Sequence, residues 1–243
     1  MSLKIYTETE PWQDFTAAYL RVREKEGRVL SDAQLLKLPR FEGSEALQKE
    51  WQLREDSAKR LLKILNNQYP KKANVLDIGC GNGWFTNSLA GAGFNATGID
   101  VNLPELEQAA RVFKHKNVSF VFADVFEWEP EEAFDAVIIS AVLQYFPSPK
   151  ALFKQLFEVN PSLKKIYILD TSFYKERDKA AAKSRTKNYY AQYGIPEMAK
   201  HYHHLSVEEL GPTAKTIYTP PHQILRKLIG SSPFPIIEVS STL

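Results

Sequence analysis

A glycine-rich turn that follows an acid in an apolar run is the part of the sequence best suited to chemistry. Residues 75–83 read Val-Leu-Asp-Ile-Gly-Cys-Gly-Asn-Gly, so three alternate glycines come directly after an apolar run containing Asp77. Glycine adopts backbone conformations that a Cβ forbids, and it lets a ligand approach the main chain. A carboxylate at Asp77 can attract an ammonium group. The turn is therefore a predicted ligand site.

Two further carboxylates extend this site. Asp100 comes seventeen residues after Gly83 and closes a second apolar run, and Asp124 follows a third. Asp100 can accept hydrogen bonds from both hydroxyls of a ribose, and Asp124 could accept one from the exocyclic amine of an adenine. Three carboxylates would repel phosphates. They therefore suit an amino-acid nucleoside that carries no phosphate.

The glycine spacing argues against the two common nucleotide motifs. A dinucleotide site needs G-x-G-x-x-G, whereas this turn reads G-x-G-x-G and continues with Trp84. A P-loop needs Gly-Lys-Ser/Thr, which the turn lacks.

Alternating elements must position these residues. Strands are predicted at 74–78, 96–100, 118–122, 134–140 and 165–170, with helices at 84–92, 103–114 and 149–159 between them. Ser148 is expected to cap the last of these helices, which has Pro149 at its first position. Such alternation predicts a mostly parallel sheet with right-handed crossovers, whose carboxyl edge binds ligands. After residue 170 only 235–240 reads as a clear strand, because Pro220 and Pro221 cut 215–218 short. A reduced or reordered sheet is therefore expected there.

Residues 74–170 resemble the core of class I S-adenosylmethionine-dependent methyltransferases with a type 11/12-like domain. Residues 77–83 resemble the first motif of that family, 98–101 its ribose-binding strand end, 123–125 its adenine-contacting segment and 140–145 the segment beside the reactive methyl. The resemblance covers about 100 of 243 residues. Residues 50–54 and 231–235 resemble a bacterial subgroup that acts on small molecules.

The resemblance implies a fold, a cofactor and a reaction. The fold would be α/β, a Rossmann-like sheet with helices on both faces: a helical cap at 1–70, a cofactor-binding core at 71–170, and a lid segment with the last strands at 171–243. S-adenosylmethionine would give its methyl group to an acceptor by in-line displacement and leave S-adenosylhomocysteine. The residues assigned to the cofactor are Asp77, Gly79, Cys80, Gly81, Gly83, Asp100, Val101, Asp124, Val125 and Ser140.

Arg54 is a further candidate for the cofactor site. It lies inside the apolar stripe of a helix predicted over 44–67, between Trp51 and Ala58. One interpretation is an arginine that snorkels from the margin of the stripe, and the other is a guanidinium facing a ligand carboxylate.

Residues after strand ends are expected to rim the acceptor pocket, although core packing remains an alternative for Tyr145 and Phe146. No catalytic residue is fixed; Tyr145, His203 and His204 are candidates. For His201, His203 and His204 a metal site, a role at the substrate and a structural role all stay open, and no metal is assigned. Cys80 is expected to pack beneath the cofactor. The residues assigned to the substrate pocket are Trp51, Gln144, Tyr145, Phe173 and Tyr174.

Other surface features are given ordinary roles. Tyr189, Tyr190 and Tyr193 are expected on the apolar side of a lid helix. The basic residues of two stretches are expected on solvated helix faces. These are Arg21, Arg23, Lys25 and Arg28, and then Lys179, Lys183, Arg185 and Lys187.

Composition limits the partners. The 31 Lys and Arg nearly balance the 29 Asp and Glu, giving a net charge of +2 that disfavours a nucleic-acid binder. A single cysteine suits a reducing compartment, so a cytoplasmic protein is expected. The protein is also expected to be a monomer or homodimer and to have no membrane partner. The predicted function is methyl transfer to an O or N atom of a small molecule. The alternatives are a methyltransferase acting on protein or RNA, and a non-catalytic module that binds S-adenosylmethionine.

Overall fold

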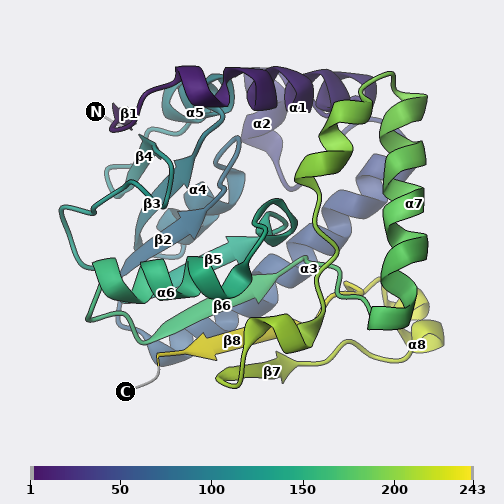
Figure 1. Ribbon diagram of the computed structural model, residues 1–243. Coiled ribbons are helices and arrows are strands. Elements are labelled where there is room, and N and C mark those ends of the chain that lie inside the picture. Colours follow the sequence, from purple (N-terminus) through teal and green to yellow (C-terminus); the bar gives the residue numbers. More distant parts are fainter. Residues whose placement is uncertain (1–2, 242–243) are drawn as a thin grey trace.

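One eight-stranded sheet organises the chain, for which a computed structural model describes residues 3–241 (Figure 1). Its order is β1-β4-β3-β2-β5-β6-β8-β7. All pairs from β1 to β6 are parallel, whereas β8 runs antiparallel to β6 and β7 antiparallel to β8. The strands are β1 (Leu3–Ile5), β2 (Asn74–Ile78), β3 (Asn95–Asp100), β4 (Val118–Phe122), β5 (Ala136–Ser140), β6 (Lys165–Leu169), β7 (Ala214–Tyr218) and β8 (Ile236–Ser240).

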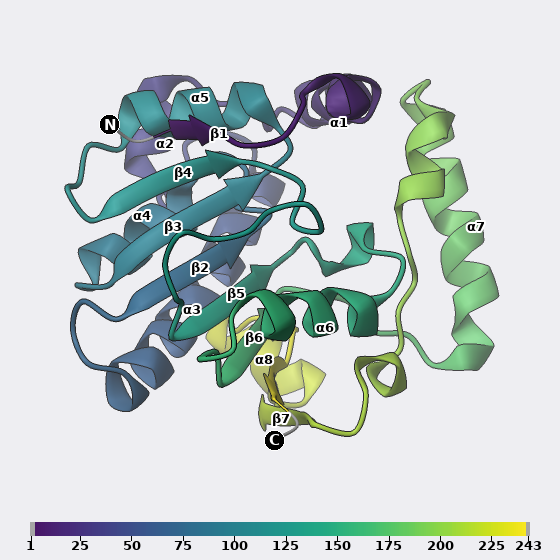
Figure 2. The same cartoon turned by 60° about the vertical axis from the view of Figure 1, so that its left-hand side comes forward.

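Helices cover both faces of this sheet. Residues of α3, α4 and α5 pack on one face, and α6 packs on the other (Figure 2). The α-helices are α1 (Gln13–Lys25), α2 (Asp32–Lys37), α3 (Glu45–Gln68), α4 (Trp84–Gly91), α5 (Leu103–Val112), α6 (Pro149–Val159), α7 (Glu176–Gln192) and α8 (Gln223–Ile229). The 3₁₀ segments are η1 (Glu10–Trp12), η2 (Leu143–Tyr145), η3 (Pro196–His201) and η4 (Val207–Leu210).

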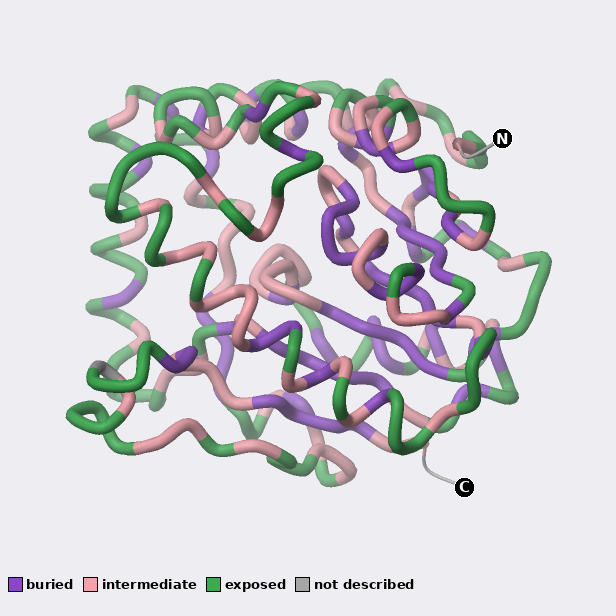
Figure 3. Tube along the Cα trace, turned by 180° about the vertical axis from the view of Figure 1, so that it is seen from behind, coloured by how far each residue is buried: buried purple, intermediate pink, exposed green. Residues whose placement is uncertain are grey.

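The central strand β5 shows why its sequence is apolar throughout. Ala136 and Ile138 point into the core layer beneath α3 and α4, while Val137 and Ile139 point into the layer beneath α6. A strand that is covered on both faces has no polar face. The tube in Figure 3 shows this buried centre. The predicted Rossmann-like α/β fold is therefore confirmed.

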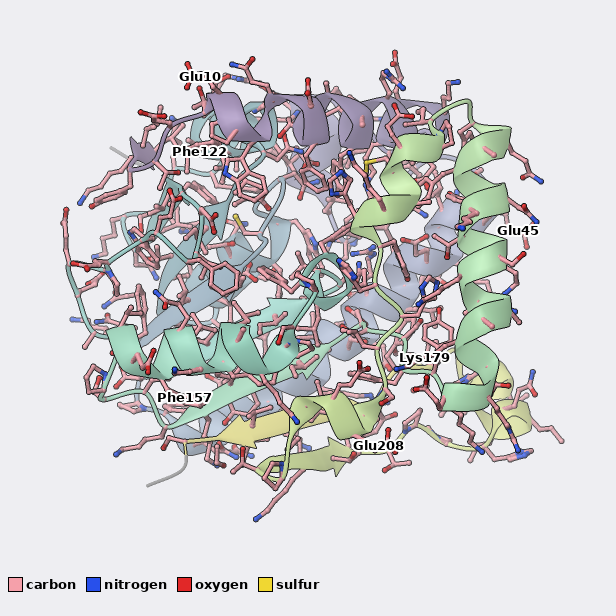
Figure 4. All side chains as sticks on the ribbon, viewed as in Figure 1. Glu10, Glu45, Phe122, Phe157, Lys179 and Glu208 are labelled. Atoms are coloured by element: carbon pink, nitrogen blue, oxygen red, sulfur yellow. The ribbon has the colours of Figure 1, made fainter. Side chains whose placement is uncertain are left out.

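Two expectations about the edges of the sheet were wrong. The sheet is not reduced, because β7 forms beside β8 and the two prolines follow β7 instead of interrupting it. Residues 1–70 are not entirely helical either. β1 extends the sheet beside β4, where Ile5 lies opposite Phe122, the residue labelled in Figure 4. β1 is too short for its pattern to have been visible in the sequence.

α1, α7 and η3 lie at the end of the sheet where the parallel strands finish (Figures 1 and 2). Val22 of α1, Tyr190 of α7 and Met198 of η3 share a small apolar cluster of their own. Lys179 of α7 pairs with Glu209 of η4 at 3.0 Å, next to the Glu208 labelled in Figure 4. The side chain of Lys179 is only 14% exposed, so the expectation that it lies on a solvated face was wrong. Within residues 3–241 no helix is long and apolar enough to cross a membrane.

Candidate functional site

The glycine turn leads from β2 into α4 in a conformation that suits glycine. Gly79, Gly81 and Gly83 have φ values of 65°, 51° and 74°. A Cβ on Gly79 would lie 2.3 Å from Cγ2 of Val142, and one on Gly83 would lie 2.5 Å from Cε1 of Phe120. The first and third glycines therefore also allow close packing of the chain against itself.

Asp100 ends β3 next to this turn and is held by the main chain. Its Oδ2 accepts a hydrogen bond from the N–H of Gly81 at 2.7 Å, and its Oδ1 accepts one from the N–H of Asn102 at 2.8 Å. Burial raises the pKa of Asp100, and these backbone donors partly offset that rise. The turn and the acid are thus fixed to each other.

Two adjoining cavities open at this edge of the sheet. The arginine cavity is lined by Arg23, Arg28 and Arg54, together with Trp51 and Trp84. The aromatic cavity is lined by Trp12, Phe15, Tyr145, Phe146 and His201, and by Asp100 and Asp124. Five residues line both cavities and so mark where they meet: Tyr19, Gly79, Gly81, Glu105 and Ala141.

Most of the residues assigned to the cofactor from the sequence lie on these cavities. Gly83 lines neither, and its position at the start of α4 is explained by packing. The arginine cavity includes Asp77, Gly79, Cys80, Gly81, Ser140 and Arg54. The aromatic cavity includes Gly79, Gly81, Asp100, Val101, Asp124 and Val125.

Arg54 belongs to a row of alternating charges along the arginine cavity. Its guanidinium pairs with Glu50 at 3.1 Å, and Arg28 bonds both oxygens of Glu50. Arg28 also pairs with Glu26 at 2.8 Å, and Glu26 pairs with Arg23 at 3.1 Å. We call these five side chains the charge ladder. The expectation that Arg23 and Arg28 lie on a solvated face was wrong, because both line the cavity.

Two acids at the glycine turn, Asp77 and Glu105, form no ion pair with any Lys, Arg or His of residues 3–241. Burial raises the pKa of Asp77 to about 7, although the Thr86 hydroxyl donates to its Oδ2 at 2.7 Å and lowers it. Burial also raises the pKa of Glu105 to about 7, and nearby Asp100 adds to the rise. A cationic ligand between these carboxyls would let them ionise.

Glu105 and the inner face of α1 were missed by the sequence analysis. Trp12, Phe15, Tyr19 and Arg23 recur at intervals of three or four residues, so one side of the helix faces the cavities. This spacing was visible in the sequence. The polar and aromatic side chains at these positions, however, did not indicate which part of the protein the helix covers. Glu105 follows the helix-capping Asn102 by three residues, beside the predicted site.

The residues assigned to the substrate pocket divide into two groups. Trp51 lines the arginine cavity and Tyr145 lines the aromatic cavity, where its ring contacts those of Phe15 and Tyr19. The other three line neither of the two cavities. Gln144 donates to the carbonyl of Ala141 at 2.7 Å, Phe173 packs into the core beneath α6, and Tyr174 lies against the His204 ring.

The histidine segment does not present its three rings to one place. His204 is buried, and its Nε2 lies 2.9 Å from the Thr186 hydroxyl oxygen. The backbone N–H of His203 donates to the carbonyl of Gln144 at 2.7 Å. Of the three, His201 alone lines one of the two cavities described above, with its ring 5.0 Å from that of Phe15. Among the described residues, no group of three or more His, Cys, Asp or Glu could hold a metal ion.

Comparison with known proteins identifies the family. Residues 48–212 match the family model described as a methyltransferase domain. This match covers well over half of the chain, so the protein belongs to that family. The predicted class of S-adenosylmethionine-dependent methyltransferases, and S-adenosylmethionine as the cofactor, are thereby confirmed.

Curated relatives match over a shorter part of the chain. The ubiquinone biosynthesis O-methyltransferase of Rickettsia akari is 33% identical over 81 residues, which is 32% of each protein. The malonyl-acyl-carrier-protein O-methyltransferase of Acetivibrio thermocellus is 34% identical over 91 residues, or 37% of this chain and 32% of that protein. The matched segments thus span about a third of the length of these relatives.

Solved structures resemble a larger part of the chain. Magnesium protoporphyrin IX methyltransferase from Synechocystis, with S-adenosylmethionine bound, superimposes with a TM-score of 0.57 at 13% identity, covering 91% of this chain and 97% of that one. The YcgJ protein from Bacillus subtilis gives a TM-score of 0.53 at 13% identity, covering 76% and 96%. At these identities the likeness establishes the fold.

Proposed function

We propose that the protein transfers the methyl group of S-adenosylmethionine to an O or N atom of a small molecule. The adenosine would lie in the aromatic cavity, with Asp100 at the ribose hydroxyls and Asp124, Val101 and Val125 around the base. The aminoacyl end would lie in the arginine cavity, where Arg54 faces its carboxylate. Asp77 and Ser140 line that same cavity.

The glycine turn fits such a ligand. Gly79 and Gly81 line both cavities, so the main chain is open to a ligand that passes from one cavity to the other. The carboxyls of Asp77 and Glu105 are suited to the positive charges that an amino-acid sulfonium carries. S-adenosylmethionine supplies an activated methyl group when bound. The protein's own task is to hold the acceptor in line and exclude water.

The observation that supports a small acceptor is the cover over the cavities. α1 contributes Phe15 and Tyr19 to their lining and η3 contributes His201, so the route to the junction passes between helices. A folded protein surface or an RNA duplex would need an open face there. The near-neutral net charge of +2 also gives little attraction for a nucleic acid.

Two measurements test this function. Calorimetric titration with S-adenosylhomocysteine should give heat and a 1:1 complex, and no heat at high micromolar ligand would refute the cofactor site. When the protein is incubated with a cell extract and S-adenosylmethionine labelled in its methyl group, the label should enter the small-molecule fraction. Label in the polymer fraction would instead support a protein or RNA substrate, and binding without any turnover would support a non-catalytic module.

A further inference from the structure

Tyr19 lies at the junction of the two cavities, which it shares with two glycines of the turn. It lines both cavities, as do Gly79, Gly81, Glu105 and Ala141. If the nucleoside occupies one cavity and the aminoacyl group the other, as in the proposed function, the sulfur that joins them lies at this junction. The phenol of Tyr19 then lies beside the route by which an acceptor approaches the methyl group.

The hydrogen bonding of Tyr19 determines what kind of acceptor atom it can contact. Arg23 donates from one guanidinium nitrogen to the Tyr19 hydroxyl oxygen at 2.7 Å, and its guanidinium carbon lies 4.7 Å from the centre of the same ring. That oxygen accepts from Arg23, so its own proton is available to a ligand in the cavities that Tyr19 lines. A donor polarised by a cation suits an acceptor atom that carries lone pairs and negative charge.

The charge ladder adds a positive bias at the same place. Its five side chains comprise three guanidinium groups and two carboxylates, in the order Arg23, Glu26, Arg28, Glu50, Arg54. Each carboxylate is shared by two arginines, so the ladder carries one cation in excess. Arg23 and Arg54 are its two ends, and both line the arginine cavity. Arg54 faces the cofactor carboxylate in the proposed function. Arg23, which also attracts Glu105, is the cation bonded to Tyr19 and is the one open to a second anion.

We propose that Tyr19 and Arg23 bind a carboxylate of the acceptor and that this carboxylate oxygen is the atom methylated. A lone pair of the oxygen forms the new O–C bond on the side opposite the C–S bond, whose electron pair stays on sulfur. The carboxylate loses its negative charge as the sulfonium loses its positive charge. No proton has to be removed, so this reaction needs no general base.

An amine acceptor would place different demands on the site. It would need to lose a proton, and before that its ammonium form would be repelled by Arg23. Glu105 is the carboxyl at the junction that could take such a proton. The two acceptor classes therefore make opposite predictions for the same two residues, Arg23 and Glu105.

Binding of paired probes separates these classes. Benzoate and benzylamine have the same ring and opposite charges. Each is titrated into protein saturated with S-adenosylhomocysteine while tryptophan fluorescence is recorded, since Trp51 and Trp84 line the cavity. We expect benzoate to bind more tightly than benzylamine. Equal affinity, or preference for benzylamine, would overturn the proposal.

Substitutions test the residues. Arg23→Met should lower the affinity for benzoate about tenfold to a hundredfold, the change expected when one hydrogen bond to a charged group is lost. Arg23→Lys should restore part of this affinity. Arg21→Met is the matched control, since Arg21 lies on the exposed side of α1 paired with Glu197. It should change nothing. Benzoate affinity that is unchanged in Arg23→Met would refute the role of Arg23.

Tyr19→Phe keeps the ring and removes only the donor. It should weaken benzoate binding about fivefold to tenfold, as loss of one hydrogen bond does. Unchanged benzoate affinity in this variant would remove Tyr19 from the proposal. Failure of wild-type protein to bind S-adenosylhomocysteine would instead refute the proposed function, so the two failures are distinguishable.

Discussion

Replacing Asp100 with asparagine is the sharpest test of the cofactor site. The carboxylate is held by the backbone N–H groups of Gly81 and Asn102 at 2.7 and 2.8 Å, and it lines the aromatic cavity. An amide retains one accepting oxygen, and its NH2 group can accept neither from a backbone N–H nor from a ribose hydroxyl. At least one charge-assisted hydrogen bond to the ligand is therefore lost. Such a bond contributes about 1.5–3 kcal/mol, which predicts an affinity for S-adenosylhomocysteine about tenfold to a hundredfold lower.

Calorimetric titration measures this change directly, and thermal unfolding shows that the variant is folded. Burial raises the pKa of Asp100, so the ionised carboxylate lowers the stability of the folded protein. Removing this charge in Asp100→Asn should therefore not by itself unfold the protein. Asp135→Asn is the control, because Asp135 is exposed near the opposite end of the strands and accepts a hydrogen bond from the N–H of Asn74. Wild-type affinity in Asp100→Asn would refute the placement of the ribose.

Three further predictions concern the packing of the glycine turn, the position of helix α1 and the pH dependence of stability. Gly79→Ala should lower the melting temperature and abolish cofactor binding, because φ is 65° and its Cβ would meet Val142; wild-type values would refute the packing argument. Thr16→Val removes a 3.2 Å hydrogen bond from α1 to the end of β3, so S-adenosylhomocysteine should bind about fivefold more weakly by calorimetry. Asp77 and Glu105 have pKa values raised to about 7, so urea unfolding should show stability falling as the pH rises from about 4 through 7, and Asp77→Asn should flatten that slope.

The sheet's interior was predictable because its signals are local. β2, β4 and β6 are runs of five residues whose apolar character needs no knowledge of the rest of the chain. Helix starts were equally readable: Ser148 accepts from the N–H of Ala151, as its position before Pro149 predicts. The glycine turn was found because three alternate glycines follow the apolar run that contains Asp77. Asp100 was found because it closes the next apolar run.

The cover of the site was not predictable in the same way. α1 is held at the end of β3 in part by Thr16, whose hydroxyl donates to the carbonyl of Val101, a contact between residues 85 positions apart. Nothing in the sequence near Tyr19 indicates that partner. Arg23 was expected in solvent for the same reason: its partners are a neighbouring tyrosine and Glu26, and its burial depends on where the whole helix lies.

The raised pKa values of the acids and the charge ladder describe one electrostatic arrangement. Asp77 and Glu105 are costly to ionise because burial disfavours their charged forms, and the attraction of Arg23 lowers the pKa of Glu105 only in part. A ligand with an ammonium and a sulfonium group would supply the missing positive charge. Its binding should therefore release protons near pH 7, and the carboxyls that reduce the stability of the free protein would then strengthen the complex.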